Sequence, residues 1–193
     1  HAQRAGAAAA AAAAIAFDLP PLDKVFSNAA LHWILRDVTR RDDVFRAAHA
    51  ALRRGGSFVF EMGGHGNVAE MRTAIASAVA RRVGPEAAAR ADPWFFPDVA
   101  WMRAALERHG FVVQSLELEP RPTPVQGGDG GGVEGWVRLM GSSFFDVVGD
   151  DGSLAREDCI RDAVNRLEAD CRSPDGGHVI GYVRLRALAR KPS

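Results

Sequence analysis

Two stretches decide the fold of this chain: Phe26-Ser-Asn-Ala-Ala-Leu-His-Trp33 and Leu52-Arg-Arg-Gly-Gly-Ser-Phe-Val-Phe-Glu-Met-Gly-Gly-His-Gly-Asn67. Each holds a short apolar strand, residues 24–28 and 57–62, that runs into a loop of small and polar residues. Between them, residues 43–53 carry apolar side chains on one helical face, with acidic residues at the start and arginines at the end. Two apolar strands that flank an amphipathic helix predict a right-handed parallel crossover, and therefore an α/β fold.

The rest of the chain continues this alternation. Helices are expected over residues 67–83, 97–109, 135–148 and 154–171, and strands over 111–119 and 179–188. Asn67 and Glu70 stand at the spacing of a capping box, and Gly55 is expected to end the first helix in a left-handed conformation. The last two strands are expected to be antiparallel. Residues 17–193 are predicted to form one α/β domain after an alanine-rich, low-complexity segment over residues 1–16.

The net charge and the two cysteines limit the classes of function that this chain can have. The 24 basic and 24 acidic residues cancel, so no global field favours nucleic acid or an anionic membrane as a partner. Cys159 and Cys171 lie twelve residues apart in one expected helix, about 120° apart around its axis, and cannot bridge. No His or Cys cluster has metal-ligand spacing. A reducing, cytoplasmic compartment and no metal site are expected.

Two further motifs are Pro93-Trp-Phe-Phe-Pro97 and Tyr182-Val-Arg-Leu-Arg186. Together with the two stretches above, they resemble class I S-adenosylmethionine-dependent methyltransferases, in the branch related to trans-aconitate methyltransferase. The resemblance runs from about residue 17 to residue 191. The sheet of that family has the strand order three-two-one-four-five-seven-six. The resemblance therefore implies that this chain is the C-terminal part of a Rossmann-like sheet, strands four to seven, with the last strand antiparallel.

The resemblance also implies a site for S-adenosyl-L-methionine and a small-molecule methyl acceptor. Next to the methionine end of the donor it implies Ser27, Asn28, Ala29 and Ala30, and near the adenine it implies Asp18. His32 is the candidate catalytic residue, a base that would suit a hydroxyl acceptor, whereas a carboxylate acceptor needs no base. Candidate acceptor contacts are Leu31, Trp33, Glu61, His65, Asn67, Trp94 and Trp136. Arg138 and Arg184 are interpreted as surface arginines, although either could anchor an acidic acceptor.

The glycine-rich donor loop of the family has no counterpart in the expected position. Gly128-Asp-Gly-Gly-Gly132 spells Gly-x-Gly-x-Gly, but the proline-rich Pro120-Arg-Pro-Thr-Pro124 separates it from the nearest strand, so a surface insertion is expected. The chain is therefore expected to be an N-terminally truncated methyltransferase that lacks the donor-binding half.

Two other functions stay open. A non-catalytic methyltransferase-like binding or scaffold protein would self-associate through the exposed edge of its sheet. A nucleotide-dependent oxidoreductase would need a glycine fingerprint after its first strand, which the sequence does not place there.

Overall fold

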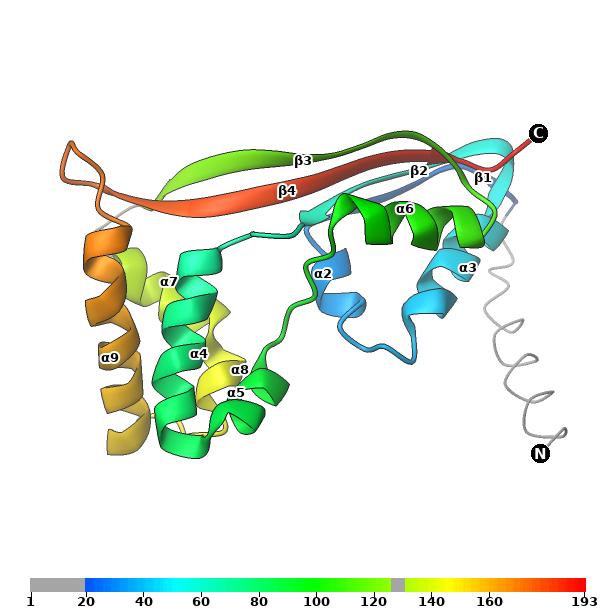
Figure 1. Cartoon of the computed structure of the whole chain (residues 1–193). Helices are drawn as coiled ribbons and strands as arrows, with labels where there is room; N and C mark the ends of the chain where they lie inside the picture. Colours follow the sequence, from blue (N-terminus) through cyan, green and yellow to red (C-terminus); the bar gives the residue numbers. More distant parts are fainter. Residues whose placement is uncertain (1–19, 126–130) are drawn as a thin grey trace, which may run out of the picture. The chain divides into compact units, whose positions relative to one another are not determined.

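The computed structural model describes residues 20–125 and 131–193, so Asp18, the segment over residues 1–16 and most of the Gly128–Gly132 tract lie outside the described residues. The described elements alternate between strands and helices (Figure 1). In chain order they are β1 (Leu22–Asn28), α2 (Leu31–Ile34), α3 (Arg41–Ala51), β2 (Leu52–Gly63), α4 (Ala69–Val83), α5 (Pro85–Ala91), α6 (Val99–Arg108), β3 (Val112–Val125), α7 (Gly132–Met140), α8 (Ser142–Phe145), α9 (Leu154–Asp170) and β4 (His178–Arg190).

The described strands form a four-stranded sheet in the order β1-β2-β4-β3. β1 pairs with β2 in parallel, with Asn28 opposite Glu61, and α3 connects the two strands. β4 pairs with β2 antiparallel, with Arg186 opposite Glu61. This confirms the α/β class, and the order is the four-five-seven-six expected from the family resemblance.

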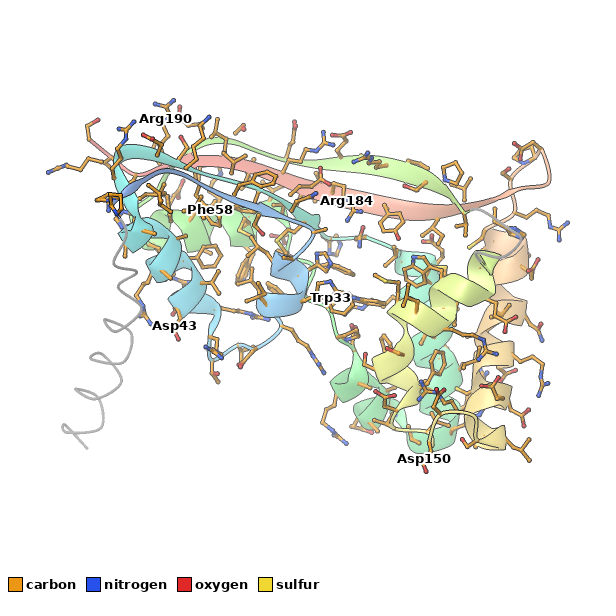
Figure 2. All side chains as sticks on the ribbon, turned by 180° about the vertical axis from the view of Figure 1, so that it is seen from behind. Trp33, Asp43, Phe58, Asp150, Arg184 and Arg190 are labelled. Carbon is orange, nitrogen blue, oxygen red and sulfur yellow. The ribbon has the colours of Figure 1, made fainter. Side chains whose placement is uncertain are left out.

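The described chain divides into two compact units, and the first holds most of the paired sheet. The first unit comprises residues 20–65, 94–119 and 184–193. Alternate side chains are buried over residues 58–62 of β2 and 185–189 of β4, because successive residues of a strand point to opposite faces. Figure 2 shows Phe58 on the side of the sheet that faces α3 and Arg190 on the opposite side. The largest buried side chains of this core are those of Leu35, Phe45, Leu52, Phe58, Phe60, Met62, Met102 and Leu106.

The second unit comprises residues 66–93 and 120–183 and is mainly helical. In it, α4 packs against α5 and α9, and α7 packs against α9 (Figure 1). Cys159 and Cys171 are buried free thiols. The predicted single helix over residues 135–148 is wrong, since α7 ends at Met140 and α8 begins at Ser142. Gly141 lies at the break, where a Cβ would approach the carbonyl oxygen of Val137 to 2.6 Å.

Helix ends test the local predictions. Asp98 is the N-cap of α6, and its carboxylate accepts a hydrogen bond from the backbone N–H of Trp101 at 2.7 Å. Gly55 is left-handed as predicted, with φ +73°, although it lies inside β2, which already begins at Leu52. The predicted capping box of α4 is wrong, because Val68 is the N-cap and no side chain caps it.

The two residues of that predicted box serve β4 instead. The side-chain oxygen Oδ1 of Asn67 accepts from the N–H of Val183 at 2.9 Å, and a carboxylate oxygen of Glu70 accepts from the N–H of Gly181. Both side chains therefore accept hydrogen bonds from N–H groups of β4, which are distant in the sequence, and not from N–H groups at the start of α4.

Candidate functional site

The carboxyl ends of β1 and β2 are joined by one backbone hydrogen bond, from the N–H of Ala29 to the carbonyl oxygen of Glu61 at 2.9 Å. Ala29 adopts a left-handed conformation with φ +53°, which is unusual for a residue with a Cβ. It follows Ser27, which is half-buried, and Asn28, which is exposed like Ala29 itself. Strained backbone of this kind concentrates at ligand sites, so the turn is a candidate binding surface.

The short helix α2 after this turn holds the next predicted residues. Leu31 and His32 are buried, and Leu31 belongs to the core of the first unit. The carbonyl oxygen of His32 accepts a hydrogen bond from the N–H of Phe95 at 2.9 Å. This bond ties α2 to the Pro93-Trp-Phe-Phe-Pro97 motif, far away in the sequence. Trp33 remains 40% exposed.

Four rings form what we call the aromatic cluster: His32, Trp33, Trp94 and Phe96. The centroid of the His32 ring lies 5.5 Å from that of Trp33 and 5.7 Å from that of Phe96. Trp94 meets Trp33 edge to face at 5.8 Å and stacks on Phe96 at 5.8 Å. Such distances and tilts are typical of stabilising aromatic pairs. The cluster brings three predicted site residues together beside the ends of β1 and β2.

His32 is held as a neutral imidazole. Its Nδ1 accepts a hydrogen bond from the N–H of Gly63 at 3.2 Å, so the proton of the neutral ring lies on Nε2. Burial and then the positive charge of Arg184 lower the pKa of His32 to about 4. A general base at neutral pH needs a free nitrogen lone pair, and here Nδ1 is occupied while Nε2 carries the proton. This geometry does not suit the predicted base; it suits a hydrogen-bond donor.

A group of charged side chains lies on the strands next to His32. Arg184 of β4, labelled in Figure 2, stands opposite Gly63 in the register. Its Nε is 3.6 Å from Oε1 of Glu61. Arg186 donates to the other carboxylate oxygen of Glu61 at 2.8 Å and also pairs with Glu119. The side chain of Arg184 is only 19% exposed, so its interpretation as a surface arginine is wrong.

Arg138 fits the surface interpretation. Its side chain is 41% exposed, and it forms ion pairs with Glu134 of α7 and Glu157 of α9. These carboxylates raise its pKa above the ordinary value for arginine.

Not all predicted site residues join this group. Asn67 and Trp136 belong to the second unit, where Asn67 bonds to the backbone of β4 and Trp136 donates from Nε1 to the hydroxyl of Tyr182 at 2.7 Å. His65 is exposed, and its backbone N–H donates to the carbonyl oxygen of Pro97 at 2.9 Å. Asn67 therefore has a structural role, because its buried amide oxygen satisfies a strand N–H.

Gly63 was not predicted as a contributor, and Arg184 was predicted only as the alternative to a surface arginine. Gly63 supplies the N–H that fixes the tautomer of His32, and no feature of the sequence marks a backbone donor of this kind. Arg184 had a detectable signal, since Arg184 and Arg186 alternate with the apolar Leu185 and Ala187. That alternation places both arginines on the same face of β4.

In the described part of the chain, no group of three or more His, Cys, Asp or Glu side chains could hold a metal ion. None of the helices in residues 20–125 and 131–193 combines the length and apolar character that crossing a bilayer requires.

The chain is similar in sequence to a methyltransferase. No protein-family model matches the chain. The uncharacterized methyltransferase C70.08c of Schizosaccharomyces pombe is 37% identical to it over 170 residues, which are 88% of this chain and 62% of that protein. The chain thus spans less than two thirds of the length of this relative.

Solved structures share the fold. Loganic acid methyltransferase with SAH superposes with a TM-score of 0.52 at 12% identity, covering 89% of this chain and 62% of that one. The YcgJ protein from Bacillus subtilis also has a TM-score of 0.52 at 12% identity, covering 92% of this chain and 68% of that one. The described sheet therefore has the Rossmann-like α/β arrangement found in methyltransferases.

Proposed function

We propose that the full-length protein is an S-adenosyl-L-methionine-dependent methyltransferase that acts on a small molecule, and that this chain is its C-terminal part. The observation that carries the proposal is the 37% identity to a methyltransferase over 88% of the chain. The strand order β1-β2-β4-β3 supports it, because it equals strands four to seven of the class I sheet. The resemblance to the trans-aconitate methyltransferase branch belongs to this proposal.

The donor is proposed to lie against the turn after β1. Ser27, Asn28, Ala29 and Ala30 would contact its methionine end, and the exposed, left-handed Ala29 would let the backbone approach the ligand closely. The donor-binding glycine loop would lie in the part of the full-length protein that this chain does not span. Methyl transfer is an in-line displacement, so the main task of both parts is to hold donor and acceptor in line and away from water.

The acceptor is proposed to be a carboxylate. The Nε2–H of His32 would donate to one carboxylate oxygen, and the guanidinium of Arg184 would supply the compensating charge. Trp33, Trp94 and Phe96 would wall the rest of the acceptor and exclude water. A carboxylate is already a nucleophile, which is consistent with a histidine that is neutral and not arranged as a base. The balanced charge of the chain favours a small molecule over nucleic acid or a membrane surface.

Labelled methyl transfer tests the proposal. The full-length protein is incubated with methyl-labelled S-adenosyl-L-methionine and a panel of mono-, di- and tricarboxylic acids that includes trans-aconitate. Arg184→Gln is expected to raise the KM for the carboxylate by about tenfold with a smaller change in kcat, since it removes binding charge rather than a reacting group. Arg53→Gln is the matched control, because Arg53 lies at the other end of β2 and pairs with Asp23.

Two results would count against it. If calorimetry detects no saturable binding of the donor to the full-length protein, the methyltransferase assignment fails. If the protein methylates only neutral acceptors, or if Arg184→Gln and Arg53→Gln behave alike, the carboxylate assignment fails while the methyltransferase assignment stands.

This chain by itself is also proposed to self-associate through β1. β1 lies at one end of the described sheet, and Phe26 on it is 71% exposed. Light scattering of this chain and of Phe26→Lys tests it; a monodisperse monomer for the unsubstituted chain would contradict the proposal. We also propose a reducing, cytoplasmic compartment for the protein. Cys159 and Cys171 support it, because both are buried and do not form a disulfide.

A further inference from the structure

A basic pocket, open to solvent, lies in the first unit at the amino end of β2. It has a volume of about 340 Å³ and is lined by His49, Arg54, Gly110, Lys191 and Pro192. Three of these five residues are basic, and none is acidic. Arg54 and Gly63 are nine residues apart on β2, about 30 Å along an extended strand. The basic pocket is therefore separate from the aromatic cluster.

The fold holds the cationic groups in place. The Nζ of Lys191 donates to the carbonyl oxygens of His49 and Leu52, at 2.8 and 2.7 Å, where α3 ends. An ammonium group has three N–H donors, so one is left for a ligand. Arg54 uses one of its five donors on the backbone oxygen of Ser193 at 2.8 Å. The two bonds of Lys191 do not neutralise its charge, because both partners are peptide carbonyl oxygens. Arg54 keeps four N–H donors that its bond to Ser193 does not use.

The wall of the basic pocket next to α3 is formed by His49, which packs closely against Gly110. Gly110 has φ +85°, and a Cβ there would lie 3.2 Å from Nε2 of His49. The His49 ring also meets the ring of Phe111 edge to face, with centroids 5.1 Å apart. The imidazole is thus held against the turn between α6 and β3, where its ring lines the pocket.

Two nearby aspartates, Asp42 and Asp23, pair with side chains that do not line the pocket. Asp42 lies 3.5 Å from Arg108 and 3.3 Å from His109, and Asp23 pairs with Arg53 at 2.5 Å. The pKa of His49 is lowered, first by burial and then by the charges of Lys191 and His109, which agrees with a positive potential at the pocket.

We propose that the basic pocket binds the oxyanion group, phosphate or carboxylate, of a small metabolite. Arg54 and Lys191 would hold the anion between them, and His49 would line its third side. The volume lies near the lower end of the range for small-molecule sites, about 300 to 1,000 Å³, and the pocket is open to solvent. A compact charged group therefore suits it better than an extended cofactor. Such a ligand would stabilise the contact between the segment after β4 and the end of α3, which Lys191 already makes through its hydrogen bonds to His49 and Leu52.

Two-dimensional NMR of this chain tests the site. Sodium phosphate and sodium acetate are titrated separately, with sodium chloride adjusted to keep the ionic strength constant. We expect saturable shifts of the Gly110 and Lys191 amides and of the His49 ring for at least one of the two anions. Saturation with phosphate assigns a phosphate group, and saturation with acetate alone assigns a carboxylate.

Adjacent arginines provide a matched pair of variants. Arg54→Gln is expected to weaken anion binding by about tenfold, the loss of one charge-assisted contact. Arg53→Gln removes an exposed neighbour that pairs with Asp23 and does not line the pocket, so it should leave binding unchanged. Both variants are first checked for an unchanged spectrum away from the pocket.

Two outcomes overturn the proposal: shifts that do not saturate with either anion, or equal weakening by Arg53→Gln and Arg54→Gln. Neither depends on methyl transfer. If Arg184→Gln loses activity and phosphate binding is normal, the proposal of an anion site in the basic pocket still stands. If anion binding fails and methyl transfer is observed, the methyltransferase proposal still stands.

Discussion

The buried His32 predicts a specific loss of stability in acid. Its pKa is lowered from an ordinary value of 6.5 to about 4 in the folded chain, first by burial and then by Arg184. Between these two pH values the unfolded chain binds a proton that the folded chain does not, so the free energy of unfolding falls as the pH falls through this window. At about 1.4 kcal/mol per pH unit, the loss approaches about 3 kcal/mol near pH 4.

The His32→Asn variant isolates this contribution. An asparagine side chain can still accept the N–H of Gly63, but it does not titrate. Urea unfolding, followed by tryptophan fluorescence, is measured at about pH 7 and about pH 4.5 for both proteins. The unsubstituted chain should lose about 2 to 3 kcal/mol more than the variant over this interval. The comparison is needed because the lowered pKa of His49 has the same sign of effect.

A second histidine serves as the control. His65→Asn removes an exposed histidine and should leave the pH dependence of the unsubstituted chain in place. The reasoning is refuted if His32→Asn and the unsubstituted chain lose the same stability in acid. An NMR titration of the His32 ring with a midpoint near 6.5 would refute it directly.

Three further substitutions test the fold, each by urea unfolding. Ala29→Gly should stabilise the chain by up to about 1 kcal/mol because it relieves a left-handed alanine, whereas Ala30→Gly, where φ is −112°, should not stabilise it. Asp98→Ala should cost about 1 kcal/mol through loss of the N-cap of α6, and unchanged stability would contradict the cap. Asn67→Ala should cost about 1 to 3 kcal/mol because the N–H of Val183 loses its acceptor; a cost below that of Asp98→Ala would argue that water replaces the amide.

The elements were predictable wherever the determining interactions are local. The β1-α3-β2 unit follows from alternating apolar segments, and the N-terminus of α6 follows from Asp98, whose carboxylate reaches the backbone only three residues on. Strand order required the family resemblance, because no local pattern states which strands pair. The capping box of α4 failed because Asn67 and Glu70 found partners on β4, more than a hundred residues away.

The candidate site was likewise predictable only in part. The sequence by itself determined that two parallel strands end in small, polar loops and that His32 and Trp33 follow the first of them. Only the tertiary structure decided what His32 can do, since the proton position depends on the N–H of Gly63 and the pKa on burial and on Arg184 of β4. Residue type fixes the groups that are available. Hydrogen bonding and charge then fix their protonation, and both come from residues that only folding brings together.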